Sequence, residues 1–286
     1  MRKSSMIFCT LMLCAGCGFE DRVPIEMTSM SRTQPLGSET ALDTNIRLDI
    51  GSLEITGSQK PDALYSFDLE YDKASYSPNI DYSPAQAGEG KLLFDLHSMH
   101  KRGVRRERFN NKLHLSFSES VPLALNINSG VGESRLSLSG LKLSSLSFEA
   151  GVGGAKMSVY EPNGIPCEFV KVKNGVGGFD ATGLGNLNFK EFDFEGGVGG
   201  ANLDFTGDWR QNAEVRIKLG VGGVNVRLPR GIGVKVEAEK SFLSGLHLEG
   251  FSQRDDYHYS EDYDSAPVKV SIRVESGVGG LRISWL

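Results

Sequence analysis

The chain has 286 residues, of which 39% are hydrophobic and 23% charged, so it is long enough for a sizeable core and is neither disordered nor collagen-like. Its formal net charge of −5 favours neither nucleic acid nor anionic lipid as a partner. The compositional anomaly is glycine, with 35 residues against 10 prolines.

The first residues have the pattern of an export signal. Two basic residues precede an apolar run over 6–15 that is too short to span a bilayer. Cys17 then follows Ala-Gly, which is the lipobox pattern of bacterial lipoproteins, although Cys14 stands where leucine is usual. We therefore expect residues 1–16 to be a cleaved signal peptide and Cys17 to be diacylated. A plain cleaved signal with a chance cysteine is the alternative.

The segment after the signal predicts a membrane-anchored protein. Residues 17–38 lack sustained periodicity, so we expect a lipidated N-terminus and a flexible tether. Gly18, and not Asp, follows the lipidated cysteine, which favours the outer membrane in a host with two membranes. The signal removes two of the four cysteines and Cys17 carries the lipid, so Cys167 has no partner for an intrachain disulfide.

From residue 39 onward nearly every run alternates apolar and polar residues with the period of a strand, and none has a sustained helical period. The tetrapeptide Gly-Val-Gly-Gly starts at residues 151, 175, 197, 220 and 277, with a near copy at 130. The intervals are 21, 24, 22, 23 and 57 residues. A period of this length with strand character is typical of a β-solenoid. We predict that residues 39–286 form one elongated right-handed solenoid with coils of about 22 residues.

The tetrapeptide predicts a corner of each coil. Apolar residues stand three and five positions before its first glycine but four and six positions after it. In a continuous strand, apolar residues that face the core keep the same odd or even spacing, so a residue between the two apolar sets must leave strand geometry. The third and fourth residues of the motif are glycines, which can adopt positive φ. The predicted corner glycines are Gly151, Gly153, Gly154, Gly175, Gly177, Gly178, Gly197, Gly199, Gly200, Gly220, Gly222, Gly223, Gly277, Gly279 and Gly280. We expect the motif valines to point into the core as a column of Val131, Val152, Val176, Val198, Val221 and Val278.

A row of charges supports the same alignment. Two positions before the motif stand Glu149, Lys173, Glu195, Lys218 and Glu275. In stacked coils these side chains would form an outward ladder of alternating sign, in which a slip by one coil places like charges together. The row therefore specifies the register.

Three segments, 121–154, 227–251 and 263–286, resemble the toastrack β-solenoid domains. These domains include the C-terminal domain of the LiaF-like cell-wall-active-antibiotic response proteins and the related adhesin-type domains. The resemblance implies an extracytoplasmic, non-catalytic module associated with envelope-stress sensing or protein interaction. In this alignment residues 50–57 are a degenerate first coil, and 58–112 are a long excursion. LiaF-like proteins carry transmembrane helices where this chain has a lipobox.

The sequence predicts neither a catalytic nor a cofactor site. No Gly-Lys-Ser/Thr and no helix follows the glycine motif, so it does not resemble a phosphate-binding loop. His97 and His100 have no nearby third ligand, and we expect ordinary histidines and no metal. The outward positions predict no cluster of catalytic carboxylates, so we expect neither an enzyme nor a small-molecule substrate.

Two segments interrupt the repeat, and binding residues often lie in such loops. Segment 253–265 contains a candidate interaction loop, and the alternative is a solvated polar loop. Its candidate residues are Asp255, Asp256, Tyr257, Tyr259, Glu261, Asp262, Tyr263 and Asp264. Segment 101–109 is basic and could meet an acidic surface, or be a solvated hairpin tip.

These features predict a lipid-anchored binding or scaffold module of the cell envelope. Its partner would be an envelope protein or a cell-wall component. A surface adhesin or structural spacer is the alternative. A polysaccharide-active enzyme is a third hypothesis, which requires acids or bases clustered on one face of the solenoid.

Overall fold

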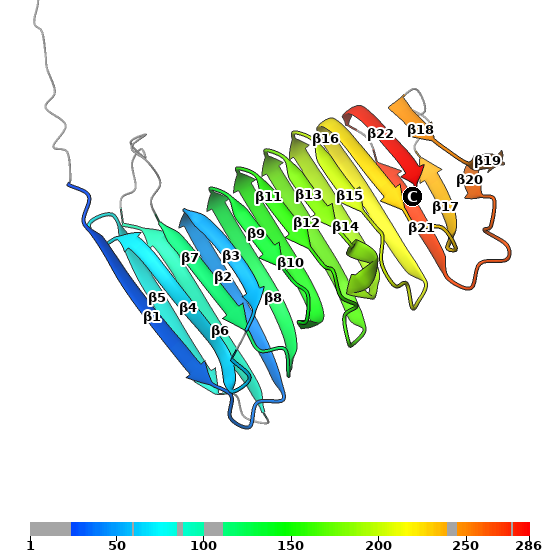
Figure 1. The fold of residues 1–286 in the computed structure, drawn as a ribbon. Helices are drawn as coiled ribbons and strands as arrows, with labels where there is room; N and C mark the ends of the chain where they lie inside the picture. Colours follow the sequence, from blue (N-terminus) through cyan, green and yellow to red (C-terminus); the bar gives the residue numbers. More distant parts are fainter. Residues whose placement is uncertain (1–23, 59, 85–87, 100–110, 239–244, 276) are drawn as a thin grey trace, which may run out of the picture.

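The structure is a computed structural model that describes residues 24–58, 60–84, 88–99, 111–238, 245–275 and 277–286. Over these residues the chain forms one open sheet of 22 strands and a short 3-10 helix, η1 (Leu184–Leu187). The strands stack along one axis into an elongated rack (Figure 1). The predicted all-β, elongated solenoid is confirmed, and its sheet does not close on itself.

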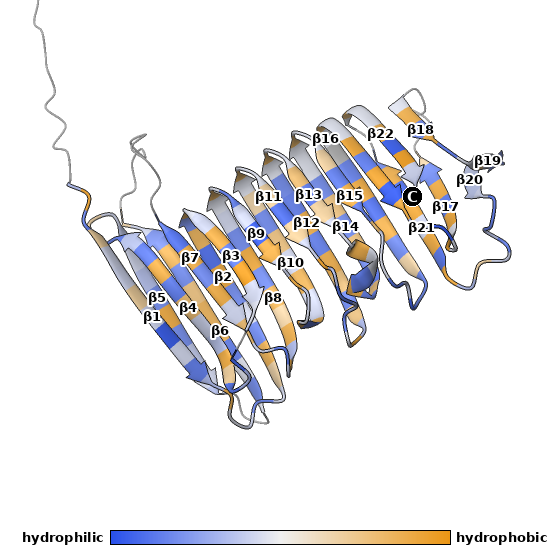
Figure 2. Cartoon of the chain, in the orientation of Figure 1, coloured by the Kyte–Doolittle hydropathy of each residue, from blue (hydrophilic) through white to orange (hydrophobic). Residues whose placement is uncertain are grey.

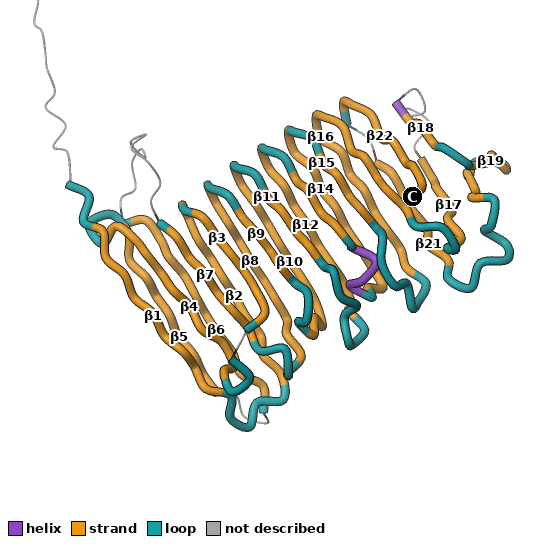
Figure 3. Tube along the Cα trace, viewed as in Figure 1, coloured by secondary structure: helices purple, strands orange, loops and turns teal. Residues whose placement is uncertain are grey.

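In the middle of the rack each coil contributes a long strand, a glycine corner and a short strand. The long strands are β8 (Pro122–Val131), β10 (Lys142–Val152), β12 (Cys167–Val176) and β14 (Phe189–Val198). The short strands are β9 (Ser134–Ser137), β11 (Ala155–Ser158), β13 (Phe179–Thr182) and β15 (Ala201–Asp204). One strand, β16 (Ala213–Leu228), runs through the corner and joins both layers. Figure 3 shows η1 among the turns at the edge opposite the glycine corners.

Neighbouring coils pair in parallel with equivalent residues side by side. Glu149 lies opposite Lys173, Lys173 opposite Glu195, and Glu195 opposite Lys218, which in turn lies opposite Glu275. The ammonium nitrogen of Lys173 is 3.9 Å from the carboxylate of Glu195. The predicted ladder of alternating charge is therefore confirmed.

The order of coils in space differs from their order in the sequence at both ends. At one end, β2 (Ala41–Ile50) and β3 (Ser52–Gly57) lie between the coil of β6 (Glu89–Ser98) and β7 (Lys112–Phe117) and the coil of β8 and β9. At the other end, β21 (Lys269–Glu275) and β22 (Val278–Trp285) lie between β16 and the coil of β17 (Gly233–Ala238) and β18 (Leu246–Leu248). Residues 50–57 are thus in the second coil of the rack and not in the first, because the excursion after them supplies the outer coil.

Antiparallel strands cover both ends. They are β1 (Met27–Pro35), β4 (Ala63–Asp72) and β5 (Tyr76–Pro84) at one end, and β19 (Phe251–Arg254) and β20 (Tyr257–Ser260) at the other. The strand β1 falls inside residues 17–38, for which we predicted a flexible tether. This prediction is wrong over 27–35, because an edge strand that buries little side-chain surface needs no alternating apolar pattern.

The core lies between the layer of long strands and the layer of short strands. Along each strand apolar and polar residues alternate (Figure 2). The ring of Phe179, on a short strand, packs between Phe148 and Phe194 of long strands, with centroids 6.4 and 5.5 Å apart. Residues three and five positions before the corner and four and six after it are buried, as in Leu146, Phe148, Ala155 and Met157. The predicted change of face across the corner is confirmed.

The third residue of the glycine motif makes that change possible. In Gly153 φ is +145°, and a Cβ built there would lie 1.8 Å from the carbonyl oxygen of Gly132 in the neighbouring coil. By contrast, a Cβ on Gly154 would meet nothing within 4 Å. Within the motif copies, positive φ is confined to the third residue, and the prediction that the fourth can also adopt it is wrong, because none of the fourth glycines has positive φ.

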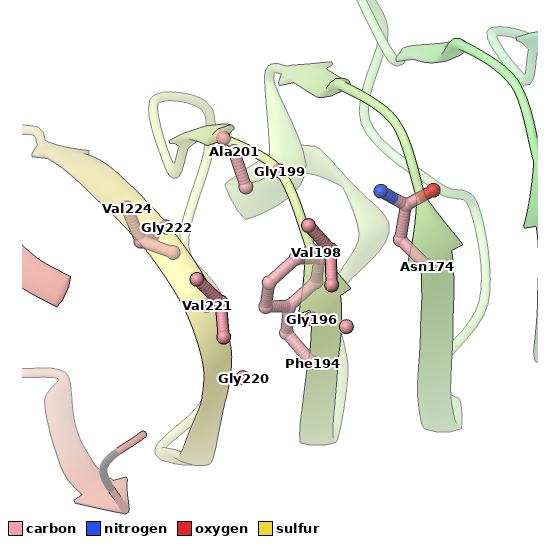
Figure 4. A pocket seen from close by; sticks show the side chains of 12 residues that line it. Asn174, Phe194, Gly196, Val198, Gly199, Ala201, Gly220, Val221, Gly222 and Val224 are labelled. Atoms are coloured by element: carbon pink, nitrogen blue, oxygen red, sulfur yellow. The ribbon is translucent and has the colours of Figure 1, made fainter. Parts of the chain in front are cut away.

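The motif valines do not point into the core. Val152, Val176, Val198 and Val221 are between 49% and 52% exposed, and Val278 is 73% exposed. Figure 4 shows Val198 and Val221 side by side at neighbouring corners. The predicted core column is instead a surface row, because at the bend the chain passes around the edge of the core and its side chains turn outward.

Candidate functional site

The longest interruption of the repeat folds as a cap on the last coil. Within the candidate loop 253–265, β20 pairs antiparallel with β17 on one side and with β19 on the other. Asp255 forms the turn between β19 and β20 with φ +56°. The segment is therefore mostly sheet and tight turns.

The acidic residues of this segment lie on its exposed turns. Asp255, Asp256, Glu261, Asp262 and Asp264 are all exposed, and the Asp264 carboxylate is 3.1 Å from the guanidinium of Arg254. Within the described part of the chain, no three His, Cys, Asp or Glu side chains are grouped so that they could hold a metal ion. The acids therefore do not converge on one site.

The three tyrosines of the segment stabilise the cap. A cationic side chain lies over each ring. The Lys235 ammonium is 4.9 Å from the centroid of Tyr257, the Arg254 guanidinium is 5.3 Å from that of Tyr259, and the Lys269 ammonium is 5.3 Å from that of Tyr263. Tyr259 and Tyr263 also pack edge to face at 4.8 Å. Tyr257 also lines a cavity, which opens on the neighbouring sheet.

This cavity is a groove of about 210 Å³ on the outer face of the long-strand layer. It crosses β14, β16, β21 and β17, and Tyr257 of β20 forms its rim. The side chains along it are Glu191, Asp193, Glu214, Arg216, Ser271, Arg273, Lys235, Glu237 and Tyr257. They form two rows, because equivalent residues of adjacent strands lie side by side.

In the first row the charges are matched. The Arg216 guanidinium is 2.8 Å from the Asp193 carboxylate, and that of Arg273 is 3.0 Å from Glu237. The hydrogen bond to Glu237 raises the pKa of Arg273 above its ordinary value. This row needs no further ligand.

In the second row the charges are not matched. Glu191 lies beside Glu214, and then come Ser271 and Lys235. Neither glutamate forms an ion pair within the part of the chain that the structure describes, and like charges on adjacent strands repel. The groove, which we call the charged groove, therefore offers two adjacent carboxylates without a direct ion pair at one end and the Lys235 ammonium over Tyr257 at the other.

The charged groove brings two carboxylates together on the outward face, where we expected no cluster of catalytic carboxylates. Glu191 and Glu214 occupy the same position of successive coils, six before the glycine motif, so the repeat alignment contained the signal for this pair. The approach of Lys235 could not be read from the alignment, because β21 lies between β16 and β17. Both glutamates are exposed on an open sheet, which lacks the apolar enclosure that prepares a carboxyl group for acid catalysis.

The glycine corner has a second, much smaller hollow (Figure 4). It measures about 10 Å³ and lies beside Asn174, Phe194 and Val198. The Oδ1 atom of Asn174 is buried there without a partner among the described residues. The hollow has room for one water molecule at most, so it is no ligand site.

Several predicted positions lie elsewhere. Cys17, His100 and the basic segment 101–109 fall outside the described residues. His97 is 3.5 Å from the carboxylate of Asp95. Cys167 is buried, and burial raises the pKa of its thiol to about 12. None of the helical structure in the described ranges is long and apolar enough to cross a membrane.

Comparison with known proteins adds a family and a set of similar folds. A family model described as "N-terminal domain of toast_rack, DUF2154" matches residues 24–180 and 162–227. A solved structure from Clostridium sporogenes, named a "putative cell adhesion protein", is 23% identical and covers 91% of this chain and 100% of its own, with a TM-score of 0.47. A "putative adhesin" from Bacteroides fragilis is 14% identical and covers 91% and 97%, with a TM-score of 0.43. No curated protein matches the chain.

Proposed function

The chain belongs to the toast_rack family, and from this premise we propose that it is a non-catalytic binding module of the bacterial cell envelope. Its charged groove would contact an envelope protein or a cell-wall component. No cofactor, metal or small-molecule substrate is part of this proposal. A link to envelope-stress sensing would follow if the partner belongs to a signalling system.

The charged groove carries this proposal. It lies on the sheet beside the cap, and Glu191, Glu214 and Lys235 in its second row form no direct ion pair among the described residues. A ligand with both basic and acidic groups would relieve the repulsion between the glutamates and also contact Lys235. Because such contacts are exposed, binding should weaken as salt is added.

The proposal includes the membrane anchor. Residues 1–16 would be removed as a signal peptide, and Cys17 would carry the lipid. Since β1 begins at Met27, the link between the lipid and the rack is shorter than the tether we first expected. The protein would be exported and anchored, in the outer membrane if the host has two membranes.

The test is crosslinking and affinity capture from native envelopes with the full-length protein. Glu191→Gln, Glu214→Gln and Lys235→Gln together remove the unmatched charges of the groove. The control carries Glu54→Gln, Glu161→Gln and Lys156→Gln, which change the same charges at exposed positions outside the groove and outside the charge ladder. We expect the wild type and the control to capture the same partner and the groove variant to lose it. Equal capture by all three proteins would refute the role of the groove.

A structural spacer is the second candidate. The elongated rack of in-register coils in Figure 1 favours it, since such a body holds its two ends at a fixed separation. A spacer predicts that no partner is captured through the groove. A surface adhesin predicts capture of a component from outside the producing cell.

A further inference from the structure

The outermost strand β1 has one unpaired edge. All nine residues from Met27 to Pro35 lie beside β4, and no other strand of the described ranges pairs with β1 (Figure 1). Its N–H and C=O groups on the far side therefore face away from the rack. Such an edge is a template for another strand.

The inner face of β1 is also uncovered. Met30 and Arg32 lie opposite Leu69 and Phe67, which are buried in the core, so they project toward the core side of the sheet. Both are nevertheless exposed, Met30 at 37%. A further strand beside β1 would cover the exposed part of the Met30 side chain and the aliphatic part of Arg32.

The other three terminal strands of the sheet are protected. The edge strand β5 contains Pro78 and Pro84, which cannot donate a ladder hydrogen bond. At the opposite end, β18 has only three residues and β19 only four. Short strands and prolines are the usual means of blocking edge-to-edge pairing. In β1, by contrast, the proline stands at the last position and Arg32 is the only charged residue.

We propose that β1 pairs antiparallel with β1 of a second copy of this chain. In the register with full overlap, a two-fold axis passes by Ser31, so that Ser31 faces Ser31, Ser29 faces Thr33, and Met30 faces Arg32. No like charges meet, and the hydroxyl pairs can hydrogen-bond across the strands. The two sheets become one continuous sheet across the axis.

The protected edges at the far end determine the type of assembly. Head-to-tail stacking would need a long free edge there, and β18 and β19 offer none. Pairing through β1 alone is isologous, and it closes after two copies. The assembly is therefore a dimer and not a filament.

The test is sedimentation velocity of the mature protein with Cys17→Ser, so that no lipid drives association. Ser31→Lys places two lysines face to face across the axis, whereas within one copy the lysine lies opposite Asp68, an exposed carboxylate. The matched control is Asn79→Lys on β5, where the new lysine lies opposite Asp95. We expect a monomer–dimer equilibrium for the wild type and the control, and a monomer for Ser31→Lys.

A charge-swapped pair tests the register. Ser31→Glu alone should also be monomeric, and mixing it with the Ser31→Lys protein should restore a dimer that contains one copy of each. A wild type that stays monomeric at every concentration would overturn the proposal. So would a Ser31→Lys protein that still dimerises, or a wild type that grows beyond two copies.

Discussion

Replacing Gly153 with alanine should destabilise the rack far more than replacing its neighbour Gly154. At Gly153 the new Cβ would start 1.8 Å from the carbonyl oxygen of Gly132 and would have to retreat to about 3 Å. Forcing a non-glycine residue into this conformation costs about 1–3 kcal/mol. The movement also disturbs two backbone hydrogen bonds of 2.9 Å, from Gly132 N to Val152 O and from Gly153 N to Val176 O.

The expected loss of unfolding free energy is the sum of the conformational cost and the cost of the two disturbed hydrogen bonds. Each disturbed hydrogen bond contributes about 0.5–1.5 kcal/mol, so the total for Gly153→Ala is about 2–6 kcal/mol. Gly154→Ala should change the free energy of unfolding by no more than about 0.5 kcal/mol, because its Cβ meets nothing within 4 Å. The pair is well matched, since both variants add one methyl group to adjacent residues of one corner.

Denaturant unfolding measures the difference. Trp209 packs against Phe189 in the core with centroids 5.3 Å apart, so its fluorescence should report loss of the coils. Far-ultraviolet circular dichroism provides a second probe. The denaturant midpoints of the two variants report their stabilities directly when the slopes of their unfolding free energies against denaturant are equal. Equal midpoints for the two alanine variants would refute the assignment of the strain to the third residue of the motif.

Three further predictions test other features. Val198→Thr, at a valine that is 52% exposed, should change stability by less than about 0.5 kcal/mol, whereas Val172→Thr in the core should cost about 1–3 kcal/mol; similar losses would contradict the outward position of the corner valines. Cys167, whose thiol pKa is raised to about 12 by burial, should react with alkylating reagents at pH 8 only as fast as the protein unfolds, and rapid labelling of the native protein would contradict its burial. Cys17→Ser should release the protein from membranes on fractionation, and continued tight association would contradict lipid anchoring.

The coil length, the alignment of coils and the change of face could all be predicted from the sequence. They depend on apolar residues at the same position of each coil, such as Phe148, Val172 and Phe194, which lie beside one another in the core. The orientation of Val152 could not be predicted in this way. Strand periodicity predicts the direction of a side chain only while the chain remains a strand, and Val152 stands at the bend where it ceases to be one.

The ends of the rack were harder to predict, because their pairings join segments far apart in the sequence. Ile46 pairs with Phe94 on one side and with Ile127 on the other, and no local pattern orders these three strands. The strand β1 lacks an apolar face and so resembled a tether. In the charged groove, the proximity of Glu191 and Glu214 could be predicted from the repeat. The proximity of Lys235 could not, because it depends on β21 lying between β16 and β17.

That displaced order has a consequence for how the protein is completed. The strands β21 and β22 follow β17 to β20 along the chain, yet they form an interior slice between β16 and the coil of β17 and β18. A chain that stops before residue 269 would not simply be one slice shorter, because the cap would lose the strands that attach it to the rest. The far end can therefore assemble only after β21 and β22 have been synthesised, so an intact cap indicates that both strands are in place.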